Sequence, residues 1–198
     1  MSNFLNLLGE RHSEYVIGTN VSQTPEEIRE LVQNVLQSVP SAMNSQTSRA
    51  VVFTGDSHAR LWEILEATQK EVLGDMFANY QGIFDGAKAG FGTVVFFEDH
   101  DAIKAGIPAN EERQTLYKEQ HAAIAEYATW LALREVDLGA SLQHFNIGYA
   151  QGFDKSIREE FNLPDSWEMN AQMPFGSIEH PADKKEKMDP SEQVISRD

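Results

Sequence analysis

Apolar residues at helical spacing predict one helix of the chain most clearly, between residues 25 and 39. Thr24 is placed to cap the first turn, Pro25 suits the first helical position, and Glu27 completes a capping box with Thr24. The helix is expected to end before Pro40. The apolar positions that carry the period are Ile28, Leu31, Val32, Val35, Leu36 and Val39.

Four further stretches predict helices. A short helix is expected over about 2–10, and Asp56 is placed to cap a helix that follows it. A long core helix is expected over about 110–136, because its second half is rich in alanine and apolar nearly all round. A smaller helix is expected over about 151–161. The helix after Asp56 carries Leu61, Trp62, Leu65, Thr68 and Val72.

Short apolar runs between these helices predict strands. Residues 50–53 form one run, and residues 93–97 form an unbroken run that suits a strand covered on both faces. Gly139 is expected to end the core helix and to precede a short strand over 140–145. Polar and apolar residues alternate over 167–176, which predicts a last strand.

The remaining segments predict loops. The stretch 74–92 contains five glycines without a strong period, and we interpret it as a loop-rich excursion. Residues 40–48 are small or carry amides, and this polar loop before a strand is a good place for a ligand site. No repeat or linker is visible. We therefore expect helices and strands to mix in one α+β domain over residues 1–198.

Composition narrows the possible functions. The 198 residues include no cysteine, which excludes disulfides, thiolate nucleophiles and zinc sites built on sulfur. A formal net charge of −15 argues against nucleic acid as a partner, since binding to its phosphates needs clustered cations. No apolar run reaches the roughly 18 residues of a membrane span, and the first residues lack the pattern of a secretory signal. We expect a cytoplasmic protein without a membrane segment.

Motifs for hydrolysis, phosphate binding and metals are incomplete. Ser141 lacks the second glycine of a G-x-S-x-G elbow, and the glycines do not form a phosphate-binding loop. The histidines include no pair at a metal-binding spacing on one helix. Glu98, Asp99 and Asp101 form an acidic cluster with His100, which we interpret as a solvated strand end rather than a metal site.

Polar residues in loops could instead hold a cofactor. Arg11, His12 and Ser13 offer a cation, an imidazole and a hydroxyl suited to a phosphate and its sugar-like arm, although a surface arginine and a capping serine also explain them. Asn44 and Gln46 are two residues apart, so both can face a planar heterocycle from an extended loop. They could equally be turn residues.

Four motifs in order along the chain resemble the FMN-dependent nitroreductase family. The resemblance covers nearly the whole chain and is strongest to a short bacterial and fungal branch with the motif Asn-Ser-Gln-x-Ser-Arg, residues 44–49 here. The motifs are Arg11-His12-Ser13, Pro40-Ser41-Ala42-Met43-Asn44-Ser45-Gln46, Gly139-Ala140-Ser141-Leu142-Gln143-His144 and Met173-Pro174-Phe175-Gly176.

The resemblance implies a mostly antiparallel central sheet flanked by helices and a homodimer with FMN at the subunit interface. By the family pattern, Arg11, His12 and Ser13 would hold the phosphate and ribityl chain of FMN. The loop from Pro40 to Gln46 would contact the flavin, its early residues from the partner subunit. The other residues implied at the cofactor are Ser41, Asn44, Gln143 and His144, with Lys185 or Lys187 joining the phosphate.

The chain departs from the family pattern at three places. Tyr15 stands where many members have a basic residue near the flavin, a role for which Arg49 and Lys88 are the candidates here. Ala42 replaces a second serine. The pair Thr47-Ser48 replaces a common Pro-Trp, so contacts around the ring are altered.

The activity that the resemblance implies is reduction of nitroaromatic or quinone-type compounds by NADH or NADPH. Hydride would pass through FMN in a ping-pong cycle, and no protein nucleophile is needed. Two alternatives stay open: a flavin-binding sensor or stress-response protein with little turnover, which the missing cation at Tyr15 favours, and an unliganded structural domain in which the polar residues satisfy buried backbone groups.

Overall fold

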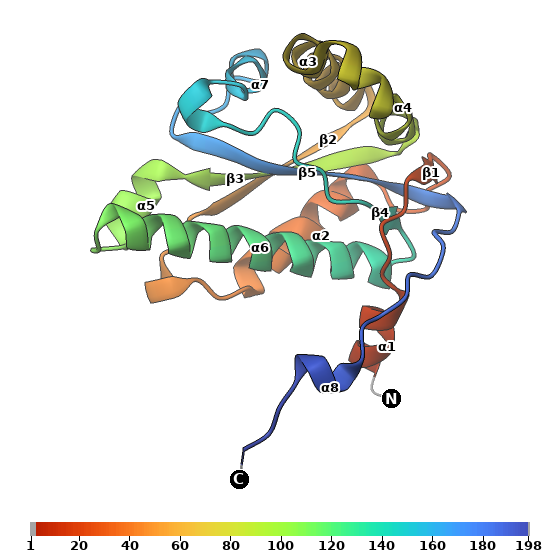
Figure 1. Cartoon of the computed structure of the whole chain (residues 1–198). Helices are drawn as coiled ribbons and strands as arrows, with labels where there is room; N and C mark the ends of the chain where they lie inside the picture. The colour runs from red at the N-terminus through yellow and green to blue at the C-terminus, as the bar shows by residue number, and fades with distance from the viewer. Residues whose placement is uncertain (1–2, 198) are drawn as a thin grey trace.

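The computed structural model describes residues 3–197 and contains a five-stranded antiparallel sheet between two layers of helices (Figure 1). The strand order is β1-β5-β3-β2, and β4 pairs with β5. This architecture confirms the predicted α+β class with a mostly antiparallel sheet. The strands are β1 (Val16–Gly18), β2 (Ser48–Thr54), β3 (Gly92–Asp99), β4 (Gly139–Ala140) and β5 (Trp167–His180).

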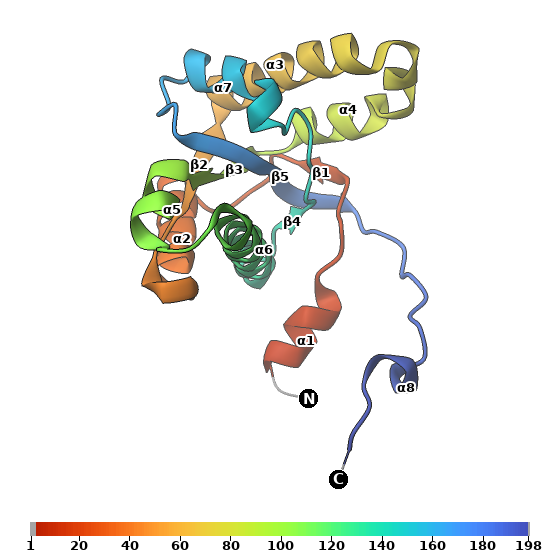
Figure 2. The same cartoon turned by 60° about the vertical axis from the view of Figure 1, so that its left-hand side comes forward.

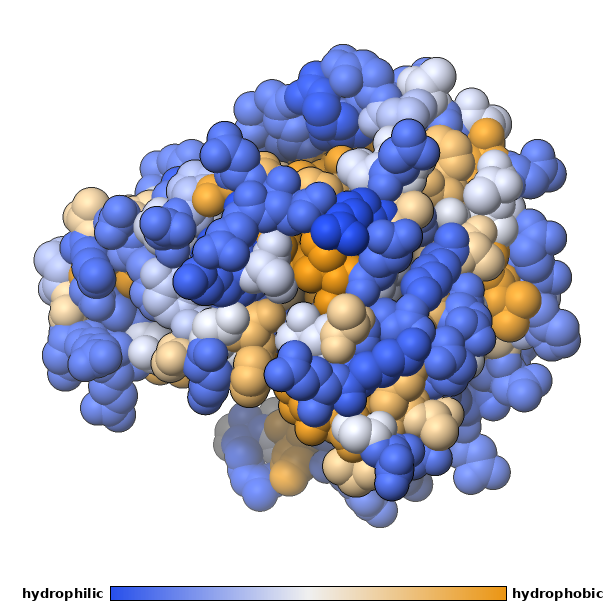
Figure 3. Space-filling model, turned by 90° about the horizontal axis from the view of Figure 1, so that it is seen from above, coloured by the Kyte–Doolittle hydropathy of each residue, from blue (hydrophilic) through white to orange (hydrophobic). Residues whose placement is uncertain are grey.

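Helices α2 and α6 cover one face of the sheet, and α3, α4 and α7 cover the other (Figures 1 and 2). The outer surface on the side of α3, α4 and α7 is mainly hydrophilic (Figure 3). The helices are α1 (Asn3–Glu10), α2 (Pro25–Ser38), α3 (Gly55–Leu73), α4 (Gln81–Ala89), α5 (His100–Gly106), α6 (Glu111–Glu135), α7 (Lys155–Glu160) and α8 (Pro190–Gln193), with short 3₁₀ helices η1 (Ala42–Asn44), η2 (Gly74–Asn79) and η3 (Tyr149–Gln151).

Alternation along β3 explains why helices lie on both faces of the sheet. Val94 and Phe96 belong to the core beneath α2 and α6, whereas Val95 and Phe97 belong to the core beneath α3 and α4. All four side chains are at most 2% exposed. A strand whose two faces are both apolar must be covered twice, so the unbroken apolar run predicted the layers.

The capping box predicted for α2 is present. The Thr24 hydroxyl accepts a hydrogen bond from the Glu27 backbone N–H (3.2 Å), and the Glu27 carboxylate accepts one from the Thr24 backbone N–H (2.7 Å). The helix ends at Ser38, before Pro40. Local capping chemistry therefore fixes both ends of α2 as the sequence indicated.

The interpretation of residues 74–92 as a loop was wrong, because η2 and α4 occupy most of this stretch. Phe77 and Phe84 are buried against α3, and the Phe84 ring lies 5.5 Å from the Trp62 ring in an edge-to-face arrangement. Packing on α3 stabilises a glycine-containing helix whose own propensity is weak.

Three other boundaries differ from the predictions, and one helix was not predicted. Helix α3 begins at Gly55 after Thr54, so Asp56 lies in its first turn and is not the capping residue. Helix α6 ends at Glu135, and the chain reverses at Asp137 (φ 62°), so Gly139 belongs to β4 rather than to a helix end. The strand predicted over 140–145 is limited to β4. The short helix α5 follows β3 directly and was not predicted.

The ends of two predicted elements also moved. Helix α7 begins at Lys155, after η3, rather than at 151. Strand β5 continues to His180, beyond the predicted end at 176, and its last residues pair with β1. The first residue of the helix predicted over 2–10 lies outside the described residues, and α1 accounts for the rest.

Candidate functional site

The predicted cofactor residues near the N-terminus lie between α6 and the loop that follows β4. Ser13 and Ala140 form a parallel bridge, and the Ala140 carbonyl accepts hydrogen bonds from the Glu14 backbone N–H (3.0 Å) and the Trp130 indole N–H (3.1 Å). These bonds fix the backbone of residues 13–14 on the core. His12 and Ser13 are half-buried there.

Arg11 is held by aromatic side chains of α6. Its guanidinium carbon lies 4.1 Å from the centre of the Trp130 ring and 5.7 Å from that of Tyr127. Among the described residues, the buried Nε of Arg11 has no hydrogen-bond partner. A half-buried guanidinium that is fixed by stacking can still present its outer nitrogens to an anionic group such as a phosphate.

The loop after β4 brings two more predicted residues to the same region. The Gln143 backbone exchanges hydrogen bonds with Gln172 of β5 (2.7 and 2.8 Å), and its side-chain amide donates to the Ser141 hydroxyl (3.0 Å). The next residue, His144, is exposed. Because Ser13 is bridged to Ala140, the 11–13 segment and the 141–144 segment are neighbours.

The loop that carries the other predicted residues has an unusual backbone. Met43, Asn44 and Gln46 adopt left-handed conformations with φ of 56°, 52° and 47°. The Ser41 hydroxyl accepts a hydrogen bond from the Gln46 backbone N–H (2.9 Å) and closes the loop. Residues other than glycine are uncommon in this region of φ and ψ because the backbone is strained there. Strained residues of this kind are concentrated at functional sites. Asn44 and Gln46 are exposed.

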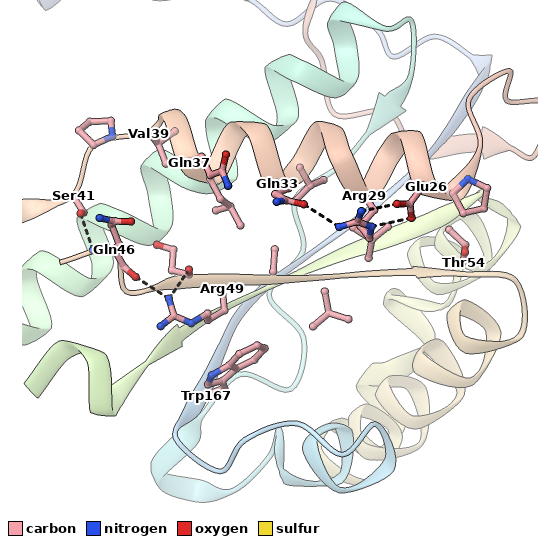
Figure 4. A pocket seen from close by; sticks show the side chains of 18 residues that line it. Glu26, Arg29, Gln33, Gln37, Val39, Ser41, Gln46, Arg49, Thr54 and Trp167 are labelled. Carbon is pink, nitrogen blue, oxygen red and sulfur yellow. Dashed lines mark hydrogen bonds and ion pairs between the residues drawn. The ribbon is translucent and has the colours of Figure 1, made fainter. Parts of the chain in front are cut away.

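A groove of about 690 Å³ runs beside this loop, between α2 and β2 (Figure 4). Ser41 and Gln46 lie at one end of it, together with Arg49 and Trp167. Arg49 donates to the Gln46 carbonyl oxygen (2.7 Å) and pairs with Asp99 (3.0 Å). The groove therefore contains part of the predicted site but not the 11–13 segment.

The two groups of predicted residues lie at different points along α6. His121 contacts the 41–46 loop, and Trp130 contacts Arg11. Nine residues separate these two positions, which corresponds to about 13 Å along a helix. One chain thus positions both groups on the same helix without gathering them around one cavity.

The tail lysines are not bonded to either group in the described part of the chain. Lys185 and Lys187 are exposed, and neither has a hydrogen bond or ion pair among the described residues. The tail does begin beside the N-terminal segment, because the Ala182 backbone N–H donates to the Glu14 carboxylate (2.7 Å). Beyond this point it runs away from the sheet (Figure 2).

Tyr15 gives the N-terminal segment no positive charge. Its side chain is 45% exposed, and its backbone carbonyl lies against Gly86 of α4. Both candidate replacements for the missing cation are already paired with carboxylates, Arg49 with Asp99 and Lys88 with Glu66. The structure places no free cation from these two residues beside Tyr15.

Comparison with known proteins identifies the family. Residues 9–177 match the sequence profile of the nitroreductase family. The chain belongs to the nitroreductase family. It is therefore a nitroreductase-family oxidoreductase, and the resemblance seen in the sequence motifs is confirmed at this level.

Similar proteins cover almost the whole chain. Nitroreductase CinD from Lactococcus lactis, in complex with chloramphenicol, is 35% identical with a TM-score of 0.85 over 99% of this chain and 100% of its own. Other CinD structures hold nicotinic acid or 4-nitrophenol. The HBN1 protein of Saccharomyces cerevisiae is 29% identical over 93% of each chain. A Desulfovibrio desulfuricans protein in complex with FMN has the same fold, with 19% identity and a TM-score of 0.71 over 100% of this chain and 98% of its own.

The pair Thr47-Ser48, at which this chain departs from the family pattern, belongs to a buried polar network that the sequence analysis did not predict. The Thr47 hydroxyl donates to one oxygen of Glu98 (2.5 Å), and the Ser48 hydroxyl donates to the other. Thr47 also lies 3.0 Å from Nδ1 of His121. The one sign of this network in the sequence was His121, a histidine on the apolar half of the core helix.

The interpretation of residues 98–101 as a solvated strand end was wrong for three of the four residues. Glu98 is fully buried, and burial raises its pKa to about 7. Asp99 caps α5, and His100 bonds Glu168 of β5 (2.5 Å). Within residues 3–197 no three His, Asp or Glu side chains are arranged to hold a metal ion. The described helices also include none that is long and apolar enough to cross a membrane.

Proposed function

We propose that this chain is an FMN-dependent NAD(P)H oxidoreductase that reduces nitroaromatic or quinone-type compounds. The observation that carries the proposal is Arg11, a stacked cation whose buried Nε is unpaired, next to a polar loop with Gln143 and His144. The buried Nε is closed off from solvent, so an anion would meet the outer nitrogens of this half-buried guanidinium. A guanidinium binds a phosphate with two parallel hydrogen bonds, and FMN carries a phosphate.

Different groups of the predicted residues would bind different parts of the cofactor. Arg11, His12 and Ser13 would bind the phosphate and ribityl chain, with Lys185 or Lys187 joining from the tail. Tyr15 would lie near the ring in place of the usual cation. When bound, FMN supplies hydride transfer from nicotinamide to acceptor in a ping-pong cycle. The residues proposed to contact the flavin ring are Ser41, Asn44, Gln46, Gln143 and His144.

The ligands of CinD support the proposed substrates. CinD binds 4-nitrophenol, a nitroaromatic compound, and nicotinic acid, which shares its pyridine ring with nicotinamide. At 35% identity over nearly the whole of both chains, the same classes of ligand are reasonable for this chain. Its own residues would position both substrates over the ring and exclude water from the reacting atoms.

A homodimer is part of the proposal. The phosphate-binding residues and the 41–46 loop lie about 13 Å apart along α6, at 1.5 Å per residue. A second chain could place its 41–46 loop beside the first chain's Arg11, so that two subunits build each site. Helix α1, which also contacts α6, and the tail with α8 project from the body in Figures 1 and 2 and would be the parts that reach a partner.

A second candidate function is a flavin-binding protein with little turnover. It is favoured by Tyr15 in place of a cation and by the pairing of Arg49 and Lys88 with carboxylates. Without a nearby positive charge, negative charge on a reduced ring would be less stabilised. This would slow reduction by a nicotinamide without preventing FMN from binding.

A visible spectrum of the purified protein, recorded without oxygen before and after adding NADH or NADPH, separates these functions. Flavin absorbance that bleaches and then returns on adding 4-nitrophenol or a quinone is the result we expect. Bound flavin that keeps its absorbance would favour the second candidate. No uptake of added FMN would overturn both.

A further inference from the structure

A chain of buried hydrogen bonds connects the 41–46 loop to β3. The Ala42 backbone N–H donates to Nε2 of His121 (2.7 Å), and Nδ1 of His121 lies 3.0 Å from the Thr47 hydroxyl. Thr47 in turn donates to Glu98 (2.5 Å), which also accepts from Ser48. Thr47 and Glu98 are fully buried and His121 is 3% exposed, so water does not compete for these bonds.

The Ala42 amide fixes which group donates and which accepts in every bond of this hydrogen-bond network. A backbone N–H can only donate, so Nε2 of His121 must offer its lone pair. A neutral imidazole carries one proton, which must then be on Nδ1 and is donated to the Thr47 oxygen. The Thr47 proton is left for Glu98. The bonds are all satisfied when His121 is neutral and the Glu98 oxygen facing Thr47 carries no proton.

Protonation of Nε2 would break this arrangement at Ala42. The imidazolium would present an N–H to another N–H, and the loop would lose its bond to α6. Three left-handed residues, Met43, Asn44 and Gln46, make this loop one that needs an external restraint. Its other restraints include the Ser41 bond to Gln46, the Arg49 bond to the Gln46 carbonyl and two backbone bonds, from Asn44 to Ser41 and from Ser45 to Ala42.

The surroundings of His121 favour the neutral form. Burial lowers its pKa, and the 41–46 loop carries no charged residue. Helix α2, which packs on α6, has its charged residues near its first turns. The titratable and charged groups nearest the network in the chain or paired with them include Arg49 on β2, Glu98 and Asp99 on β3, His100 on α5, Glu168 on β5, and Lys118, Glu119 and Glu126 on α6. Helix α5 also carries Asp101 and Lys104.

We propose that His121 is a positioning residue of the flavin site, which holds the 41–46 loop ready for the cofactor when neutral and releases it when protonated. The inference rests on the proposed function, because it takes Ser41, Asn44 and Gln46 as flavin contacts. It also explains Thr47 and Ser48, the pair that departs from the family's common Pro-Trp, since both donate to Glu98.

The protonation state can be tested without FMN by nitrogen-15 NMR of the full chain labelled at histidine. At pH 7.5 His121, assigned by comparison with His121→Gln, is expected to carry its proton on Nδ1 and a bare Nε2. On acidification the Ala42 amide resonance should shift together with the His121 nitrogens. A proton on Nε2 at pH 7.5 would overturn the inference, whether or not the protein binds FMN.

The effect on the cofactor site is tested by FMN affinity at pH 7.5 and pH 5.0. The wild type is expected to lose at least tenfold more affinity on acidification than His121→Gln, whose amide oxygen can accept from Ala42 and does not titrate. Protonation of the FMN phosphate affects all variants alike and cancels in this ratio. His121→Phe should bind weakly at both pH values.

His58→Gln is the matched control. His58 is also buried and bonds a threonine hydroxyl, that of Thr93 at 3.1 Å, but it lies on α3, on the other face of the sheet. This variant should keep the wild-type pH dependence. Equal losses in the wild type and His121→Gln would overturn the inference, whereas a wild type that takes up no FMN at pH 7.5 would overturn the proposed function and leave the decision on His121 to NMR.

Discussion

At the scale of single residues, Glu98 shows how burial changes acid–base behaviour. Its pKa is raised to about 7 by burial, against the hydrogen bonds from Ser48 and Thr47 that favour the ionised form. The folded protein therefore keeps a proton that the unfolded chain releases near pH 4.5. Its contribution to stability is complete below pH 4.5 and is lost as the pH rises through 7.

Glu98→Gln removes this titration. The unfolding free energy of the variant should therefore increase relative to that of the wild type as the pH rises. Between pH 5 and pH 8 we expect a relative gain of about 2–3 kcal/mol, at 1.36 kcal/mol per pKa unit. Urea unfolding of both proteins at the two pH values measures it. Asp99→Asn is the control, because hydrogen bonds from Ser166 and Ala102 outweigh burial and lower the Asp99 pKa; its difference from the wild type should stay constant. A constant difference for Glu98→Gln as well would contradict the prediction.

Arg11 is the residue on which the proposed phosphate site depends. Arg11→Ala should weaken FMN binding roughly ten- to a hundredfold, as expected for the loss of a charge-assisted hydrogen bond. Quenching of FMN fluorescence on binding gives the affinity. Arg60→Ala removes an exposed arginine of α3 that pairs with Glu63 and Glu160, and it should leave the affinity unchanged. If the two variants bind FMN alike, Arg11 does not contact the phosphate.

At the scale of elements, α4 supports the N-terminal segment through a close backbone contact. A Cβ on Gly86 would lie 2.3 Å from the Tyr15 carbonyl oxygen, whereas a Cβ on Gly82 in the same helix meets nothing within 4 Å. Gly86 is thus required by packing, and Gly82 is not. Alanine substitutions at these two glycines can therefore be compared within one helix, with Gly82 as the control.

Gly86→Ala should lower the unfolding free energy by about 1–3 kcal/mol, the usual effect of overpacking. It should also weaken FMN binding, because Tyr15 would move together with residues 11–13. Gly82→Ala should instead stabilise the protein by roughly 0.5–1 kcal/mol through helix propensity. Urea unfolding and FMN titration of both variants measure the two effects. A stable Gly86→Ala with normal FMN affinity would show that α4 does not hold this segment.

At the scale of the whole molecule, the separation of the two residue groups along α6 allows a direct test of a shared site. Arg11→Ala and Asn44→Ala should each weaken FMN binding in their own homodimers. If each site combines Arg11 of one chain with Asn44 of the other, a mixed dimer of the two variants has one intact site and one doubly altered site. Co-expressed chains with different tags would give such dimers.

The mixed dimer is expected to bind one FMN with wild-type affinity. If both residues came from the same chain, each site in the mixed dimer would have one altered residue and none would recover. Sedimentation equilibrium of the wild type, with an expected mass of twice 22.2 kDa, checks the dimer first. A wild-type protein that sediments at the mass of one chain would contradict the shared site.

The sequence by itself determined the parts of the molecule that depend on local chemistry. It predicted the capping box of Thr24 and Glu27, the long apolar β3 and the alanine-rich α6. Residues close together in the sequence determine helix caps and the hydrophobic period, so these features can be recognised without the fold. The motif order also led to the family. The bridge between Ser13 and Ala140, which joins the first and third of these motifs, was found only in the structure.

Only the tertiary structure decided the features that depend on contacts between distant residues. Helix α4 forms because Phe84 packs on α3, which its glycine-rich sequence does not indicate. Glu98 is buried rather than solvated because Thr47 and Ser48, about fifty residues earlier in the chain, bond both of its oxygens. The role of His121 likewise depends on Ala42, seventy-nine residues away. The energy of a buried polar group is set by its partners, and the fold alone brings those partners together.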